Sequence, residues 1–251
     1  MAKLALRLGV ILGFLLLWQG VAWLGVWPPY LFPSPLDVGR TLWQLTESGT
    51  LLPAVLVTLR RILVGFVLAS VGGVLLGFGL ARSQWLSTTF GPVVLGLQGM
   101  PSICWFPLAI LWIGLNEGAI LFVTTVGALF AIAATTESAI RNIPPVYLHA
   151  ASTMGARGLR LYTRVILPAA MPALLTGLRV GWSFAWRSLM AAELLIMNLG
   201  LGFLLEMGRN LADAAQVVGV ILVILALGLV VDRLVFARFE RRVRQRWGFE
   251  P

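Results

Sequence analysis

The stretch HAASTMGARGLRLYTRVILP, residues 149–168, is a long polar break between hydrophobic runs of this chain. Three arginines in it, Arg157, Arg160 and Arg164, recur at helical spacing and therefore share one face. Small residues, which let another surface approach the backbone closely, lie at Ala150, Ala151, Gly155 and Gly158. Pro168 suits the first turn of the next helix. The stretch predicts a short helix–turn–helix outside the bilayer that faces a partner protein; the alternative is a basic loop that only meets the charge of the lipid.

The composition is that of a membrane protein. Of 251 residues, 59% are hydrophobic and only 12% are charged, whereas a soluble domain carries about a quarter charged residues. We therefore expect an all-α polytopic membrane protein, with residues 1–251 forming a single transmembrane domain.

Several kinds of chemistry are disfavoured by the residue counts. One cysteine and one histidine exclude a disulfide framework and leave few ligands for a metal. Lys3 is the only lysine, so the chain has no Walker A motif and cannot bind ATP phosphates through a P-loop. We expect no enzymatic activity in this chain, and any ATP hydrolysis must occur in another subunit.

Six hydrophobic runs are long enough to cross a hydrocarbon core of about 30 Å. They cover residues 8–27, 62–81, 87–114, 118–137, 169–195 and 214–232, and a loop at 141–168 lies between the fourth and the fifth. The first run could instead be a signal peptide, but it is long for one and no A-x-A cleavage site follows it. The prediction is six transmembrane helices.

The positive charges set the expected orientation, because cytoplasmic loops are enriched in Lys and Arg. With six spans, the cytoplasmic side receives Lys3, Arg7, Arg82, Arg141, Arg157, Arg160, Arg164, Arg238, Arg241, Arg242, Arg244 and Arg246. The outer side receives Arg40, Arg60, Arg61 and Arg209. Both termini should thus be cytoplasmic, and the net charge of +9 reflects membrane topology rather than nucleic-acid binding. The basic tail from Arg238 onward should anchor to lipid.

Two sequence features on the expected outer side lie before the second span and at its start. Ser34, Pro35 and Asp37 have the order of a helix cap, a first-turn proline and a first-turn acid, so an amphipathic helix should begin there on the outer surface. Arg60 and Arg61 should mark the start of the second span. They either extend their charged ends to the interface or meet an acidic patch on a soluble binding protein.

The third span is expected to be broken. Gln98, Met100 and Pro101 lie in the middle of a long uncharged run. Irregular backbone at membrane depth is tolerated only where it faces protein or a water-filled cavity, and in transporters it often marks the pathway. The alternative is a proline kink that only shapes packing.

The fifth span carries charges, Arg179, Arg187 and Glu193, with Trp186 among them. A charge at membrane depth costs about 3 kcal/mol and therefore faces a partner or a cavity. Arg187 precedes Glu193 by six residues, about 9 Å along a helix, so the two are not simple neighbours on one face. Arg187 could bind a substrate anion or a residue across a subunit interface, or it could pair with Glu193 within the bundle.

The polar stretch also resembles a known motif. The cytoplasmic loop of ABC importer permeases has the pattern E-A-A, three residues, G, nine residues, I-x-L-P. Ala150-Ala151, Gly155 and Leu167-Pro168 fall on that spacing, while His149 replaces the Glu and Val165 replaces the Ile. The segments PSPLDV, LQGMPSICWFPLAILWIG and GLRVGWSFAWRSLMAAELL are also similar to this family, in its sulfonate, taurine, nitrate and bicarbonate branch.

The resemblance implies a type I ABC importer permease fold with a cytoplasmic coupling helix. It further implies a homodimer with one central pathway, two copies of an ATPase that bind ATP and Mg, and an extracytoplasmic solute-binding protein; this chain itself would bind no cofactor. The residues expected to couple to the ATPase are His149, Ala150, Ala151, Met154, Gly155, Arg157, Leu159 and Pro168. The residues expected along the translocation pathway are Gln98, Met100, Pro101, Arg179, Trp186, Arg187 and Glu193.

The predicted function is ATP-driven import of a small anionic solute across a bacterial inner membrane, by alternating access. The main alternative is a secondary transporter or channel that works without ATP, and a weaker one is a membrane-anchored assembly or sensor protein. The solute stays open among sulfonates, taurine, nitrate, bicarbonate and a neutral pyrimidine precursor.

Overall fold

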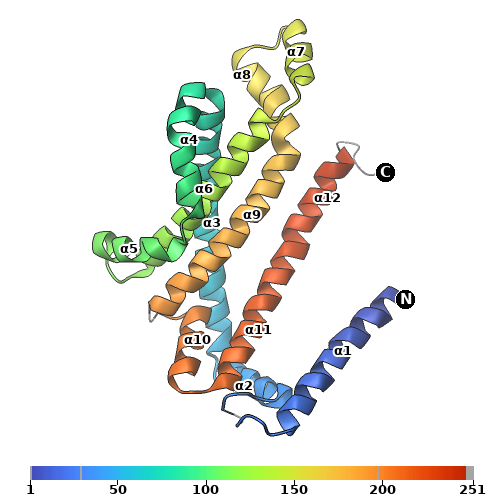
Figure 1. Ribbon diagram of the computed structural model, residues 1–251, viewed down its shortest axis with the longest axis vertical. Coiled ribbons are helices and arrows are strands. Elements are labelled where there is room, and N and C mark those ends of the chain that lie inside the picture. Colours follow the sequence, from blue (N-terminus) through green and yellow to red (C-terminus); the bar gives the residue numbers. More distant parts are fainter. Residues whose placement is uncertain (1, 29, 197, 247–251) are drawn as a thin grey trace. The chain divides into compact units, whose positions relative to one another are not determined.

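The computed structural model describes residues 2–28, 30–196 and 198–246, and within these ranges every regular element is a helix (Figure 1). The all-α prediction is therefore confirmed. The chain forms two compact units. The first comprises Met1–Leu59 and Glu193–Leu227, and the second comprises Arg60–Ala192 and Gly228–Pro251.

The first unit contains α1 (Ala2–Trp23), α2 (Pro35–Glu47), the start of α3 (Leu51–Arg82), α10 (Leu201–Asn210) and most of α11 (Ala214–Val231). Its core is built from Ala54, Leu201, Leu204 and Val220. The predicted start of α2 is confirmed as a capping box. The Asp37 backbone N–H donates to Ser34 Oγ at 3.2 Å, and the Ser34 N–H donates to the Asp37 carboxylate at 3.2 Å.

Glu193 organises the start of α10. Its carboxylate is fully buried, and it accepts hydrogen bonds from the Gly202 N–H at 3.0 Å and from Thr58 Oγ1 at 2.9 and 3.1 Å. Thr58 Oγ1 in turn accepts from the Leu201 N–H at 2.9 Å. A carboxylate at a helix N-terminus is favoured by the exposed N–H groups there. Gly200 must stay small, because a Cβ on it would lie 2.7 Å from Glu193 Oε2.

The second unit holds the remaining elements. They are most of α3, α4 (Gln84–Gly99), η1 (Ser102–Trp105), α5 (Phe106–Ile113), α6 (Glu117–Arg141), α7 (Pro145–Thr153), α8 (Gly158–Leu161), η2 (Tyr162–Ile166), most of α9 (Leu167–Leu195), η3 (Asp232–Phe236) and α12 (Ala237–Arg246). α7 and α8 lie at one end of this unit, beyond the ends of α6 and α9 (Figure 1).

Glycines bring α3 and α6 into close contact. A Cβ on Gly77 would lie 2.3 Å from the carbonyl oxygen of Ala133, and one on Gly73 would lie 2.7 Å from that of Leu129. Helices in membranes associate through such small-residue faces because their backbones can then approach closely. Gly73 and Gly77 therefore give α3 a small-residue face where it meets α6.

Within the described ranges, four helical runs are long and apolar enough to span a membrane: Leu51–Arg82, Glu117–Arg141, Tyr162–Leu195 and Ala214–Arg242. A fifth candidate is the pair Gln84–Gly99 and Ser102–Ile113, which is bent by 102° at the predicted break. The predicted first span falls on α1, whose described apolar part, Leu12–Trp23, is shorter. The count of six spans stays a prediction.

At two predicted span ends the helix continues beyond the predicted span, and the span bounds themselves stay predictions. α3 begins at Leu51, so Arg60 and Arg61 lie inside a helix instead of opening it; both contact the carboxylate of Glu117, which supplies their counter-charge within the chain. The last helical run also continues past Asp232. Residues 229–246 contain no proline or glycine to end a helix, and Asp232 is neutralised by an arginine of α9.

Candidate functional site

The stretch at 149–168 folds as the predicted helix–turn–helix. α7 and α8 flank a turn in which Gly155 has φ +78°, and Gly158 at the start of α8 has φ +54°. Both values lie in the left-handed region, which glycine adopts without steric cost. The side chains of Ser152 and Thr153 donate to the carbonyl of His149 at 2.8 and 2.9 Å and close the last turn of α7.

The surface of this element is open and partly apolar. Met154 is 87% exposed, and His149, Ala150, Gly155 and Arg157 are exposed around it. Two other predicted coupling residues have different positions: Ala151 is buried, and Pro168 is half-buried at the start of α9. The side chain of Leu159 lies outside the described part of the chain.

The helix–turn–helix packs against the rest of the second unit. The ring of Tyr162, just after α8, packs on Phe78 with centroids 5.1 Å apart, and the Arg82 guanidinium lies 5.7 Å from the Tyr162 centroid. Its base packs into a small apolar core. That core consists of Ala139, Ile143, Ile166, Ala170 and Leu174. A displacement of the loop would therefore be passed to α3, α6 and α9.

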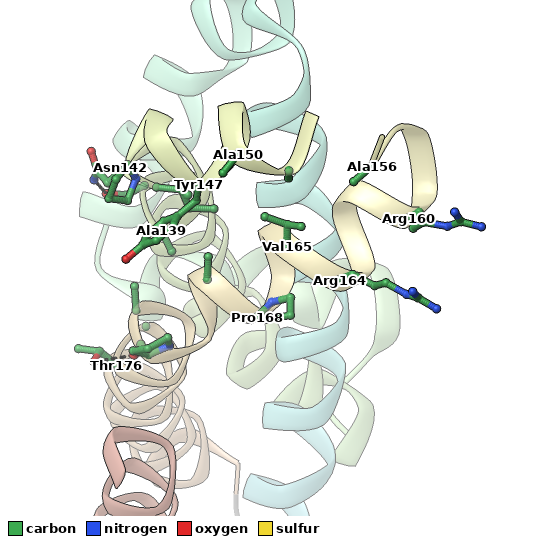
Figure 2. Close-up of a pocket in the computed structure, with 18 of the residues that line it drawn as sticks. Ala139, Asn142, Tyr147, Ala150, Ala156, Arg160, Arg164, Val165, Pro168 and Thr176 are labelled. Atoms are coloured by element: carbon green, nitrogen blue, oxygen red, sulfur yellow. Dashed lines mark hydrogen bonds between the residues drawn. The ribbon is translucent and has the colours of Figure 1, made fainter. Parts of the chain in front are cut away.

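A cavity of about 1080 Å³ opens beside the loop, bounded by α6, α7, α8 and α9 (Figure 2). Its polar lining comes from Thr135, Ser138, Asn142, Tyr147, Arg160, Arg164 and Thr176. Figure 2 shows Arg160 and Arg164 extending to the same side of their helical segment. No carboxylate is among the described lining residues, so the charged groups at this cavity are cations.

An exposed stripe continues along α9 from the cavity. Its members follow one another at intervals of three or four residues and so share one helix face. They are Ala173, Thr176, Val180, Ser183 and Arg187, of which the first three line the cavity. Arg187 is exposed, its Nε donates to the carbonyl of Ser183 at 3.1 Å, and its guanidinium lies 4.7 Å from the ring centroid of Phe184. Among the described residues it forms no ion pair.

The segment after the break of the third span lies close to the part of α9 that carries Arg187. A Cβ on Gly127 of α6 would lie 2.0 Å from Ser188 Oγ and 3.0 Å from the Cβ of Ser102, the first residue of η1. The residues that follow Pro101 and the residue next to Arg187 therefore converge on one point of α6. Gln98 is half-buried, and its Oε1 accepts no hydrogen bond from the described residues.

The other predicted pathway residues of α9 have separate surroundings. The indole of Trp186 stacks on Trp182 at a centroid distance of 6.2 Å. Arg179, which the sequence assigns to the pathway, forms ion pairs with Asp232 at 2.7 Å and Glu240 at 3.3 Å. Glu193 belongs to the first unit, where it holds α10. Of the two arginines predicted for the pathway, Arg179 has carboxylate partners, whereas Arg187 has none among the described residues.

The Arg179 contacts could not be found from local pattern, since Asp232 is 53 residues away. The only signal in the sequence is the spacing of Asp232, Phe236 and Glu240, which places two acids and an aromatic residue on one helix face. In the described part of the chain, no three His, Cys, Asp or Glu side chains gather as a metal site requires.

Residues 69–245, which include the helix–turn–helix, the cavity and the broken span, match the family of the binding-protein-dependent transport system inner membrane component. The chain belongs to this family of ABC importer permeases. It is therefore a multi-pass membrane protein and a transport subunit, and the ATPase of such a transporter is a separate subunit. Family membership implies an ATPase and a substrate-binding protein as partners of this permease.

Several curated relatives are similar to this permease over most of its length. It is 31% identical to the putative aliphatic sulfonates transport permease protein SsuC of Escherichia coli (strain K12), over 94% of this chain and 89% of that one. It is 28% identical to the taurine transport system permease protein TauC of the same organism, over 90% and 86%. It is 34% identical to the riboflavin transport system permease protein RibX of Chloroflexus aurantiacus, over 97% and 90%.

A solved structure shows the same fold. A chain of the MetNI methionine ABC transporter, in an inward-facing conformation, superposes with a TM-score of 0.68 at 22% identity. The match covers 79% of this chain and 98% of that one. The type I importer fold predicted from the sequence is therefore confirmed.

Proposed function

We propose that this permease forms a homodimer that imports a small anionic solute, driven by two ATPase subunits docked on its helix–turn–helix elements. The observation that carries the proposal is the exposed, partly apolar surface around Met154, built on a turn that requires glycine and fixed to the ends of α6 and α9. An exposed apolar patch rimmed by polar residues is typical of a protein-binding surface.

The coupling follows from the connection of this surface to the bundle. ATP and Mg bind to the ATPase subunits, whose closure displaces the docked element. The helix α9 follows it directly, through η2, and carries the displacement along the exposed stripe to Arg187. Alternating access then results because the nucleotide state favours one of two arrangements of the helices. In this proposal both termini are cytoplasmic, the membrane is a bacterial inner membrane, and the binding protein delivers solute from outside.

The anionic class of the solute is supported by Arg187 and by the cavity. A lone guanidinium within a span is costly unless an anion or water meets it, and the described charges around the cavity are positive. SsuC and TauC are named for sulfonates and taurine, whereas RibX is named for riboflavin. We therefore favour a sulfonate-type solute, with nitrate and bicarbonate as smaller candidates. Gln98, Met100, Pro101 and Trp186 complete the proposed pathway.

The docking surface is tested by replacing Met154 with glutamate. The change removes an apolar contact worth about 1.5–3 kcal/mol when buried and adds a charge, so ATPase co-purifying with the permease should fall by about tenfold or more. Leu211→Glu is the matched control, because Leu211 is 69% exposed and lies in the turn after α10 in the first unit. Equal ATPase recovery with both variants would contradict docking at this surface. Solute uptake by the permease without any ATPase would favour the secondary transporter instead.

The role of Arg187 is tested by uptake into proteoliposomes that contain the assembled transporter. The probes are labelled taurine, methanesulfonate and nitrate, and a thermal shift of the cognate binding protein selects among them. Arg187→Gln should lower the uptake of the selected anion by about tenfold, because a hydrogen bond to a charged group contributes about 1.5–3 kcal/mol, while ATPase docking persists. Arg238→Gln removes an exposed charge from α12 and should transport normally. Unchanged uptake by Arg187→Gln would remove Arg187 from the pathway.

A further inference from the structure

The guanidinium of Arg179 joins α9 to the last helical run at two carboxylates, those of Asp232 and Glu240, which lie eight residues apart. Its Nε and Nη2 donate to the two carboxylate oxygens of Asp232, both at 2.7 Å, and its Nη1 donates to Glu240 Oε2 at 3.3 Å. Bidentate arginine–carboxylate pairs are directional as well as strong. We call these three residues the Arg179 clamp.

In the last helical run, the residues that contact α9 differ in charge from the residues that are exposed. Asp232, Phe236 and Glu240 lie at intervals of four residues and face α9. The ring of Phe236 lies 5.9 Å from that of Trp182 and 6.2 Å from that of Phe66, between centroids. The described cations of this run outside the clamp are exposed, namely Arg233, Arg238, Arg241 and Arg242. In η3 and α12, Asp232 and Glu240 thus bond to Arg179, whereas the described arginines are exposed.

The clamp coincides with an unusual backbone segment. Asp232 and Phe236, which both contact the α9 side, are the first and last residues of the π-helical turn η3. Such turns are rare and often lie at functional sites. A second π-helical turn, Tyr162–Ile166, joins the helix–turn–helix to α9. A π turn therefore lies at the point where the helix–turn–helix joins α9, and another lies where α9 contacts the last helix.

Resting on the ATPase docking proposed above, we propose that Arg179 is a positioning residue of the transport cycle, which makes the last helix, meaning η3 and α12, follow α9 when the coupling surface moves. Arg179 lies eleven residues beyond Pro168, about 17 Å along a continuous helix. Three nitrogens bonded to two carboxylates eight residues apart prevent η3 and α12 from sliding or rotating against α9. Aromatic contacts alone would hold the two helices together without fixing their register.

The clamp is better suited to transmission than to stability. The side chains of Arg179 and Asp232 are both more than a third exposed, and ion pairs at such exposure contribute little to folding. The contacts of Phe66, Trp182 and Phe236 remain when the clamp is removed. Loss of the clamp should therefore leave a folded permease in which the last helix no longer responds to the ATPase.

The test is hydrogen–deuterium exchange on the permease–ATPase complex in lipid nanodiscs, without nucleotide and with ATP plus vanadate. In the wild type, deuterium uptake should change with nucleotide in peptides from 162–180 and from 232–246. In Arg179→Gln, the change should persist over 162–180 and be lost over 232–246. The double variant Arg179→Asp with Asp232→Arg should restore it, and Arg233→Gln, which removes an exposed charge next to the clamp, should keep both responses.

The clamp proposal is overturned if Arg179→Gln keeps the full nucleotide response over 232–246, or if the wild type shows none there while 162–180 responds. No response in either segment of the wild type would instead contradict docking of the ATPase at the helix–turn–helix. If Arg179→Gln fails to assemble, Asp232→Asn combined with Glu240→Gln opens the same clamp from the other helix, with the same expected loss over 232–246.

Discussion

Gly77→Leu is expected to prevent the permease from reaching a stable fold. A Cβ at this position would lie 2.3 Å from the carbonyl oxygen of Ala133 and 2.6 Å from the Cβ of Thr136. The first of these atoms is backbone, so α3 and α6 must separate to admit any side chain. Overpacking of a close contact costs about 1–3 kcal/mol, and leucine adds three further carbons to the clash. The melting temperature in detergent should fall strongly, with most of the protein aggregated.

The matched control is Gly79→Leu, two residues further along α3. Nothing lies within 4 Å of a Cβ on Gly79, so the same substitution meets open space there. Size-exclusion profiles and thermal unfolding in one detergent compare the two variants directly. A melting temperature for Gly77→Leu equal to that of Gly79→Leu would show that the contact between α3 and α6 is not as close as described.

Features set by neighbouring residues could be predicted from the sequence. The cap of α2 depends on Ser34 and Asp37, three residues apart, and the turn after α7 depends on a glycine at Gly155. The break near Pro101 is likewise local, because a proline removes a backbone donor and restricts the residue before it. Each of these follows from the chemistry of a few adjacent residues, and each has its predicted place in the structure.

Features set by distant contacts could not be predicted. Arg179 meets Asp232, which is 53 residues away, and the start of α10 depends on Glu193 together with Thr58. Hydrophobicity alone also did not show that α3 begins at Leu51, before the predicted span, or that Glu117 neutralises the two arginines within the helix. Local pattern identifies a charge in a span but does not reveal the residue that neutralises it.

The charges of α9 show why these partners matter for function. Glu193 is satisfied by hydroxyl and backbone donors, and Arg179 is satisfied by two carboxylates. Both charges are therefore accounted for by the architecture of their own units. Arg187 lies on the exposed face that continues from the cavity, where the chain provides a carbonyl and an aromatic ring as neighbours. By this comparison it is the α9 charge best placed to meet a solute.

Gly155→Trp should reduce transport to background and remove ATPase docking, while the permease stays inserted in the membrane. The residue has φ +78°, and nothing lies within 4 Å of an added Cβ. Bulk at this position therefore meets no neighbour within the chain, and two effects remain. The first is backbone strain, about 1–2 kcal/mol for a residue with a Cβ in the left-handed region. The second is a collision with whatever protein packs on the turn.

A series of substitutions at this position separates the two effects. Asparagine tolerates the left-handed conformation, so Gly155→Asn should keep most of the docking, whereas the strain in Gly155→Val should lower ATPase recovery by about fivefold to thirtyfold, the equivalent of 1–2 kcal/mol. Gly155→Trp adds the collision and should be the weakest of the three. If docking falls with the volume of the side chain, whether or not the residue tolerates a positive φ, then collision with the partner has a larger effect than backbone strain. Normal docking and normal uptake by Gly155→Trp would mean that the ATPase does not bind this turn, because a bulky ring cannot be accommodated in a close protein contact without displacing it.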